Sequence, residues 1–106
     1  MNIELLRHLS EAFGPSGCED EVREIIRNEL SQFTKEITVD AVGNLIAHIP
    51  GGGPKVLVDA HMDEVGFMVR MIDKNGFVYF IPLGNTMPEI VYAQKVVAKG
   101  KRRKLK

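Results

Sequence analysis

Hydrophobic residues in the first third of the chain recur at helical spacing. One stripe precedes a break at Gly14-Pro15-Ser16-Gly17 and a second stripe follows it, which predicts two amphipathic helices. Asn2 is placed to cap the first helix, and Ser16 and Glu19 have the Ser-x-x-Glu form of a capping box for the second. The predicted inward-facing residues are Leu5, Leu6, Leu9 and Phe13, then Val22, Ile25, Ile26, Leu30 and Phe33.

From residue 35 the pattern changes to the alternation of β-strands. Ile37 and Val39 alternate with polar residues, a turn covers residues 40–44, and a second strand follows over residues 45–49. His48 lies in that strand without a carboxylate among its sequence neighbours, so we predict an ordinary polar-face residue. The continuous apolar run at residues 56–58 predicts a fully buried central strand.

Beyond Gly66 the pattern is entirely that of β-structure. Strands are predicted over residues 67–72 and 77–83, joined by a turn at residues 73–76 whose Asn75-Gly76 pair is a strong hairpin signal. A last strand is predicted within residues 91–99. This change of pattern predicts a division into residues 1–68 and residues 69–106, and the second part would leave an open strand edge.

Charge is unevenly distributed along the 106 residues. The formal charge is zero, yet the last eight residues hold six Lys and Arg and no acid, which leaves a net charge of −6 on the first 98. Because no aromatic residues interleave with this basic run, we interpret it as a solvated hairpin turn and expect no nucleic-acid partner.

Other features of the composition indicate a soluble intracellular protein. No apolar run reaches the length of a membrane span, so we expect no membrane partner. The polar amino terminus is unlike a signal peptide, and the single cysteine, Cys18, excludes an internal disulfide. We therefore expect a cytoplasmic protein in which Cys18 is a small buried residue.

Three ionisable residues follow the run at 56–58. His61, Asp63 and Glu64 would lie at the carboxyl end of a buried strand, where open α/β sheets place their chemistry. An imidazole nitrogen can bind a metal, and a carboxylate two residues later can orient the ring. The alternative to a metal site is an ordinary exposed loop in which His61 hydrogen-bonds to Asp63 and binds no metal.

Three stretches of the chain carry recognisable motifs: Gly14–Val22 (GPSGCEDEV), Asp40–Leu45 (DAVGNL) and Asp59–Val69 (DAHMDEVGFMV). In order and spacing, they together resemble a family of dinuclear metallo-aminopeptidases. This family contains the glutamyl and deblocking aminopeptidases that assemble into tetrahedral particles, and some members have been labelled endoglucanases or cellulases.

The resemblance implies an α/β fold: the amino-terminal part of a mixed-sheet zinc-peptidase domain, followed by the start of an inserted small β-barrel-like domain. It implies a homo-oligomer and a peptide substrate from which the amino-terminal residue is hydrolysed. His61 matches the first metal ligand, and Asp63 matches the catalytic-site carboxylate that orients it. The family binds two divalent ions, zinc or cobalt.

The family's remaining ligands and its general-base glutamate lie further along than residue 106. The resemblance therefore implies an amino-terminal portion with an incomplete site, inactive alone. Two other functions stay open. The β edges could make the chain a non-enzymatic, self-associating interaction module. A glycoside hydrolase needs two carboxylates flanking a sugar, but Asp63 and Glu64 are neighbours whose side chains normally diverge.

Overall fold

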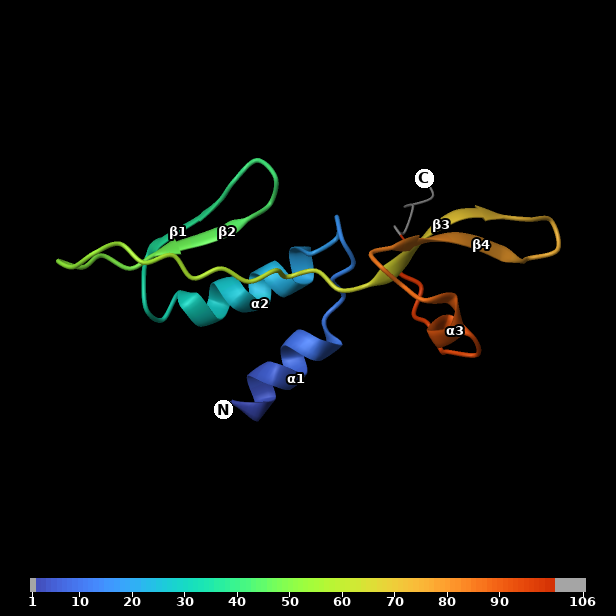
Figure 1. Ribbon diagram of the computed structural model, residues 1–106, viewed down its shortest axis with the longest axis horizontal. Coiled ribbons are helices and arrows are strands. Elements are labelled where there is room, and N and C mark those ends of the chain that lie inside the picture. Colours follow the sequence, from blue (N-terminus) through green and yellow to red (C-terminus); the bar gives the residue numbers. More distant parts are fainter. Residues whose placement is uncertain (1, 101–106) are drawn as a thin grey trace, which may run out of the picture.

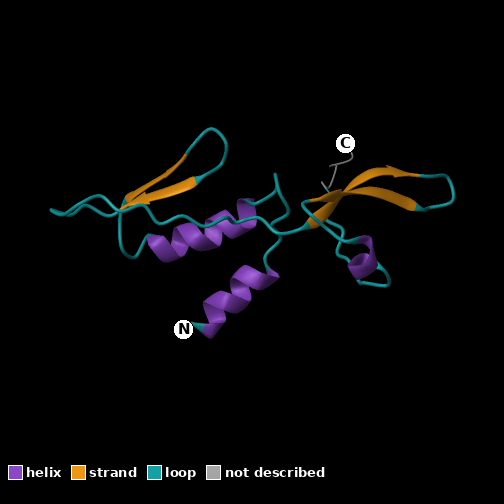
Figure 2. Ribbon diagram, viewed as in Figure 1, coloured by secondary structure: helices purple, strands orange, loops and turns teal. Residues whose placement is uncertain are grey.

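Two helices and two separate β-hairpins make up most of the regular secondary structure in the described residues. The computed structural model describes residues 2–100. In chain order, α1 (Ile3–Glu11) and α2 (Asp20–Leu30) precede the first hairpin, and the second hairpin is followed by the one-turn helix α3 (Pro88–Val91). The hairpins lie at opposite ends of the long axis (Figures 1 and 2). The predicted α/β class and the two predicted helices are confirmed.

The first helix begins as its sequence predicts. The Asn2 side chain accepts a hydrogen bond from the Leu5 N–H at 3.2 Å, which satisfies one of the free amides of the first turn. In the part of the chain that the structure describes, no helix is long and apolar enough to cross a membrane.

The predicted capping box of the second helix is wrong. α2 begins at Asp20 with Glu19 at the N-cap position, and Glu19 makes no side-chain cap. Its carboxylate accepts instead from the Gly17 N–H at 2.6 Å. Ser16 lies outside the helix, and its hydroxyl donates to Asp63, 47 residues further along. A local motif has here been overridden by a tertiary contact.

The first hairpin pairs β1 (Glu36–Val39) with β2 (Leu45–His48) in antiparallel register. It is joined to α2 by the Arg23 guanidinium, whose Nε donates to the Gly43 carbonyl at 2.8 Å. Glu36 lies directly across from His48, and its carboxylate is 2.6 Å from His48 Nδ1. His48 therefore has a carboxylate partner, which the strand register supplies.

The turn of this hairpin is organised by Asp40. Its carboxylate accepts from the Val42 and Asn44 amides at 3.0 and 2.9 Å and from the Asn44 side chain at 2.8 Å. The hydrogen bond from the Asn44 side chain, with further help from the Asn44 amide, holds the pKa of Asp40 below its ordinary value.

We expect Asn44→Ala to raise the pKa of Asp40 toward its ordinary value. A lowered carboxyl pKa in the folded state contributes stability above the unfolded-state pKa and loses it as the pH falls through the folded value. The variant should therefore show a weaker loss of hairpin structure on acidification. A carbon-detected NMR titration of the Asp40 carboxyl measures this. Asn75→Ala is the matched control and should leave this pKa unchanged, because no side-chain bond of Asn75 involves Asp40.

The second hairpin confirms the Asn75-Gly76 signal. β3 (Gly66–Ile72) pairs antiparallel with β4 (Val78–Leu83), with a bulge between Val69 and Met71. Gly76 has φ 88° and donates to the Asp73 carbonyl at 3.1 Å, a backbone conformation that glycine adopts without strain.

Two predicted strands are absent from the described residues. The apolar run Val56–Val58 is extended but unpaired, with each residue 83–90% exposed, so the prediction of a buried central strand is wrong for this chain. It forms a single extended trace between the first hairpin and β3 (Figure 1). A buried strand needs neighbours on both edges, and no described strand pairs with it.

The predicted last strand is also wrong. Pro88–Val91 forms α3, and residues 94–100 carry no regular structure. Within this segment Lys99 pairs with Glu21 at 2.5 Å and lies 4.8 Å from the centroid of the Phe13 ring. The proposed hairpin turn in the basic run falls largely on residues 101–106, which lie outside the described residues.

The chain is far from compact. Its radius of gyration is 17.9 Å, whereas a compact domain of about 100 residues has about 13 Å. Its accessible surface is 9976 Å², whereas a compact monomer of this mass exposes roughly 5,900 Å². Among the described hydrophobic residues only Ala12 and Val22 are buried, each 6% exposed. Contacts within the chain thus cover little of its apolar surface.

Candidate metal site

The His61 ring lies against the carboxylate predicted to orient it. Its Nδ1 is 3.0 Å from Asp63 Oδ1 and 2.9 Å from the Asp63 carbonyl oxygen. Both partners are acceptors, so Nδ1 carries the proton and the lone pair of the neutral ring is on Nε2. The His61 side chain is 85% exposed. This geometry turns a potential ligand atom toward the surroundings, while the role of His61 as a metal ligand stays a prediction.

Asp63 has a second partner that sequence reasoning missed. Its Oδ2 accepts a hydrogen bond from the Ser16 hydroxyl, while Oδ1 faces His61. The hydrogen bond from Ser16, followed by the one from His61, lowers the pKa of Asp63. The carboxylate is therefore ionised at neutral pH, as an orienting acceptor must be.

The loop that carries Ser16 docks on the segment that carries His61. The Glu64 amide donates to the Gly14 carbonyl at 2.9 Å, and the Glu64 carboxylate accepts from the Gly14 amide at 3.2 Å. Pro15 and Glu64 form an isolated parallel β-bridge. A Cβ on Gly66 would lie 2.9 Å from the Pro15 ring, so the absence of a side chain at Gly66 permits this approach. Glu64, which had no predicted role, thus holds the loop.

The other polar candidates do not join this site. In residues 2–100, no group of three or more His, Cys, Asp and Glu side chains is placed to hold a metal ion. Cys18 is exposed, so its predicted burial is wrong. The carboxylates of Asp63 and Glu64 are occupied by different partners, Ser16 with His61 and Gly14 respectively, which offers no support for a glycosidase pair.

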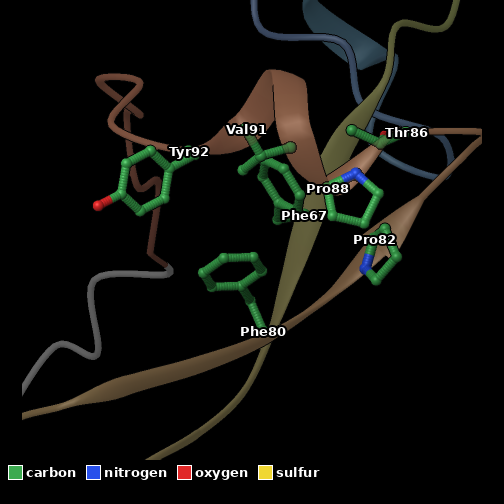
Figure 3. Close-up of a pocket in the computed structure, with 7 residues that line it drawn as sticks. All are labelled: Phe67, Phe80, Pro82, Thr86, Pro88, Val91 and Tyr92. Atoms are coloured by element: carbon green, nitrogen blue, oxygen red, sulfur yellow. The ribbon is translucent and has the colours of Figure 1, made fainter.

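An apolar hollow of about 410 Å³ opens between β3, β4 and α3 (Figure 3). Phe67 and Phe80 pack edge to face, with ring centroids 4.6 Å apart. The lining residues are Phe67, Phe80, Pro82, Thr86, Pro88, Val91 and Tyr92. With only the hydroxyls of Thr86 and Tyr92 among apolar side chains and no charged group, the hollow lacks the chemistry of a catalytic site.

Comparison with known proteins places these features in a family context. The model of the M42 glutamyl aminopeptidase family matches residues 43–106. The chain is 42% identical over 94 residues to the lysyl aminopeptidase of Pyrococcus furiosus, a match that covers 88% of this chain and 27% of that protein. It is 32% identical over 93 residues to the glutamyl aminopeptidase of Lactococcus lactis, covering 85% of this chain and 26% of that protein.

A solved structure shares the fold. A TET aminopeptidase from the marine sediment archaeon Thaumarchaeota archaeon SCGC AB-539-E09 matches with a TM-score of 0.76 and 37% identity, over 83% of this chain and 25% of that one. The chain therefore spans about a quarter of the length of the relatives that it matches.

Proposed function

Because the chain belongs to the M42 glutamyl aminopeptidase family, we propose that it supplies the His61–Asp63 part of a metal-dependent aminopeptidase centre. The substrate would be a peptide from which the amino-terminal residue is hydrolysed. Support comes from the family match and from relatives whose names describe aminopeptidases.

The observation that carries this proposal is the match of residues 43–106 to the M42 family, and the contact between the exposed His61 ring and Asp63 agrees with it. Metal-binding histidines commonly donate their second ring N–H to a carboxylate, which fixes the tautomer and makes the free nitrogen a better ligand. The described residues reproduce this arrangement: Nδ1 faces Asp63 Oδ1 at 3.0 Å, and the imidazole is exposed. These residues fit a zinc or cobalt ion at Nε2.

Divalent ions, when bound, would supply polarisation of the scissile carbonyl and a water of lowered pKa. His61 would hold one ion, and Asp63 would keep the imidazole in the tautomer that presents its lone pair. Neither residue acts as the general base.

We place the rest of the centre in polypeptide outside the described residues. A catalytic zinc ion takes about three protein ligands, and residues 2–100 contain no group of three His, Cys, Asp or Glu side chains placed to hold an ion. The chain's accessible surface of 9976 Å² exceeds that of a compact monomer by about 4,000 Å², which leaves ample surface for further polypeptide to cover. The unpaired extended segment Val56–Val58 is part of that surface.

We further propose that the two hairpins belong largely to different parts of the assembled protein, with the boundary inside β3. In this proposal residues 1–68 belong to the α/β metallopeptidase domain. Residues 69–106 begin an inserted small β-barrel-like domain that contributes to a homo-oligomer. The open edges of β3 and β4 and the apolar hollow beside them support an assembly surface here.

Complementation tests this proposal. The pure 106-residue chain is expected to show no aminopeptidase turnover. Mixing it with the remaining three-quarters of the Pyrococcus furiosus lysyl aminopeptidase, produced separately, should restore turnover that a chelator abolishes. Hydrolysis of an aminoacyl-p-nitroanilide, followed with and without added Zn²⁺ or Co²⁺, measures it.

Two outcomes would contradict the proposal. Chelator-sensitive turnover by the chain alone would show that its own residues complete the centre. A stable complex without metal-dependent turnover would favour the second candidate, a non-enzymatic module that associates through its exposed β edges. Light scattering of the chain alone discriminates further, because that second candidate requires self-association.

A further inference from the structure

The Ser16 hydroxyl is the outermost member of a chain of side chains that leads to His61. It donates to Asp63 Oδ2, while Asp63 Oδ1 lies 3.0 Å from His61 Nδ1. We infer that Ser16 is a positioning residue: by holding the Asp63 carboxylate, it selects the His61 tautomer that leaves Nε2 free to bind a metal ion. The inference rests on the proposed function only in naming a metal as the ligand of Nε2.

The carboxylate needs such a constraint. Asp63 has two rotatable side-chain bonds, and its side chain is 38% exposed. Unconstrained, it would exchange its contact with the imidazole for water. A hydrogen bond to Oδ2 from Ser16 leaves Oδ1 as the oxygen that faces Nδ1. The Asp63 carbonyl oxygen, 2.9 Å from the same nitrogen, is a second acceptor, so loss of Ser16 should weaken the preference rather than abolish it.

Ser16 is itself held in place by backbone contacts. The Gly14–Glu64 hydrogen bonds and the Pro15–Glu64 bridge fix the residues before it to the His61 segment. After it, the Cys18 amide donates to the Pro15 carbonyl at 2.8 Å and closes a tight turn. The hydroxyl therefore reaches Asp63 from a rigid loop.

This role differs in a measurable way from that of a hydrogen bond that only stabilises the loop. A purely structural bond would change the fraction of folded molecules and leave the histidine tautomer of the folded chain unaltered. A positioning bond changes the ratio of Nδ1–H to Nε2–H rings among folded molecules. The ratio is observable without any metal.

The test is a long-range proton–nitrogen NMR spectrum of the metal-free 106-residue chain at a pH where the ring is neutral. Wild type is expected to show protonated Nδ1 and unprotonated Nε2. Ser16→Ala should move the tautomer ratio at least about threefold toward Nε2–H, and Ser16→Thr, which keeps the hydroxyl, should restore it. Ser10→Ala is the matched control, because the Ser10 hydroxyl donates to the Leu6 carbonyl within α1.

A second readout uses Co²⁺ alone as the probe. Loss of an outer partner of a metal-binding histidine typically lowers metal affinity by about 10–100-fold. Because Ser16 acts through Asp63, Ser16→Ala should raise the Co²⁺ dissociation constant by about threefold to tenfold, measured by visible absorption.

An unchanged tautomer ratio in Ser16→Ala would overturn the inference, as would an equal shift in Ser10→Ala. A wild-type chain with the ratio of an unstructured peptide would overturn it as well. If the tautomer responds to Ser16 but Co²⁺ does not bind even after the chain is mixed with the remaining three-quarters of the Pyrococcus furiosus lysyl aminopeptidase, the proposed metal function fails while the positioning of His61 by Ser16 stands.

Discussion

His61→Ala is expected to lower kcat/KM by more than about a hundredfold in a chimera that joins this chain to the remaining residues of the Pyrococcus furiosus lysyl aminopeptidase. The physical reason is the loss of a ligand in direct contact with a metal ion, which should exceed the roughly 10–100-fold effect of outer partners. Alanine leaves no side-chain atom able to replace the imidazole nitrogen. Peptidase kinetics and the number of bound ions, determined by atomic emission, measure the effect.

Asp63→Asn supplies the comparison for this experiment. An amide can orient its oxygen toward Nδ1, as the carboxylate does at 3.0 Å, but it carries no negative charge. We expect a loss of about 10–100-fold with metal retained at higher metal concentrations. If His61→Ala kept its activity and two bound ions, the assignment of His61 as a ligand would be wrong.

Gly14→Ala is expected to give the largest loss of folding stability. A Cβ on Gly14 would lie 2.6 Å from Val22 Cγ2, closer than real Cβ atoms approach. Val22 is 6% exposed and lies in α2, so it has little room to move. Overpacking of this kind costs about 1–3 kcal/mol. Because so little of the chain is buried, that loss should unfold a large fraction of the α2 region.

Urea denaturation followed by far-ultraviolet circular dichroism measures this change. Gly52→Ala is the control, since nothing lies within 4 Å of a Cβ there; its effect should stay within about 0.5 kcal/mol, as for most surface substitutions. Equal unfolding midpoints for the two variants would show that the Gly14 contact with Val22 does not hold the loop against α2. A lower midpoint for Gly14→Ala should come with weaker binding of Ser16 to Asp63.

Prediction from the sequence succeeded where the determining interactions are local. The Asn2 cap, both helices and the two hairpins depend on residues within a few positions of one another, as the Asp73–Gly76 turn illustrates. It failed for Val56–Val58, because a buried strand depends on neighbouring strands, and the described residues supply none.

At the candidate site, too, the local contact was predicted from the sequence and the long-range contacts were not. The contact of His61 with Asp63 spans two residues and was anticipated from the motif. The roles of Ser16 and Glu64 were missed, because their partners lie 47 and 50 residues away. The local sequence around Ser16 fits a capping box. Only the tertiary structure shows that the Ser16 hydroxyl binds Asp63 instead. The one available signal was that Ser16 lies in a stretch that resembles the family.

By itself the sequence determined the helices, the hairpins, the family and the spacing of the histidine from its carboxylate. Each of these depends on short-range geometry or on residue order. Tertiary structure alone decided which oxygen of Asp63 faces the imidazole, what holds the other oxygen, and that His48 meets a carboxylate across the strand pair. The Ser16–Asp63 contact joins residues 47 positions apart, and no local pattern encodes the loop closure that brings them together. The partner of His48 depends on the exact register of the strand pair.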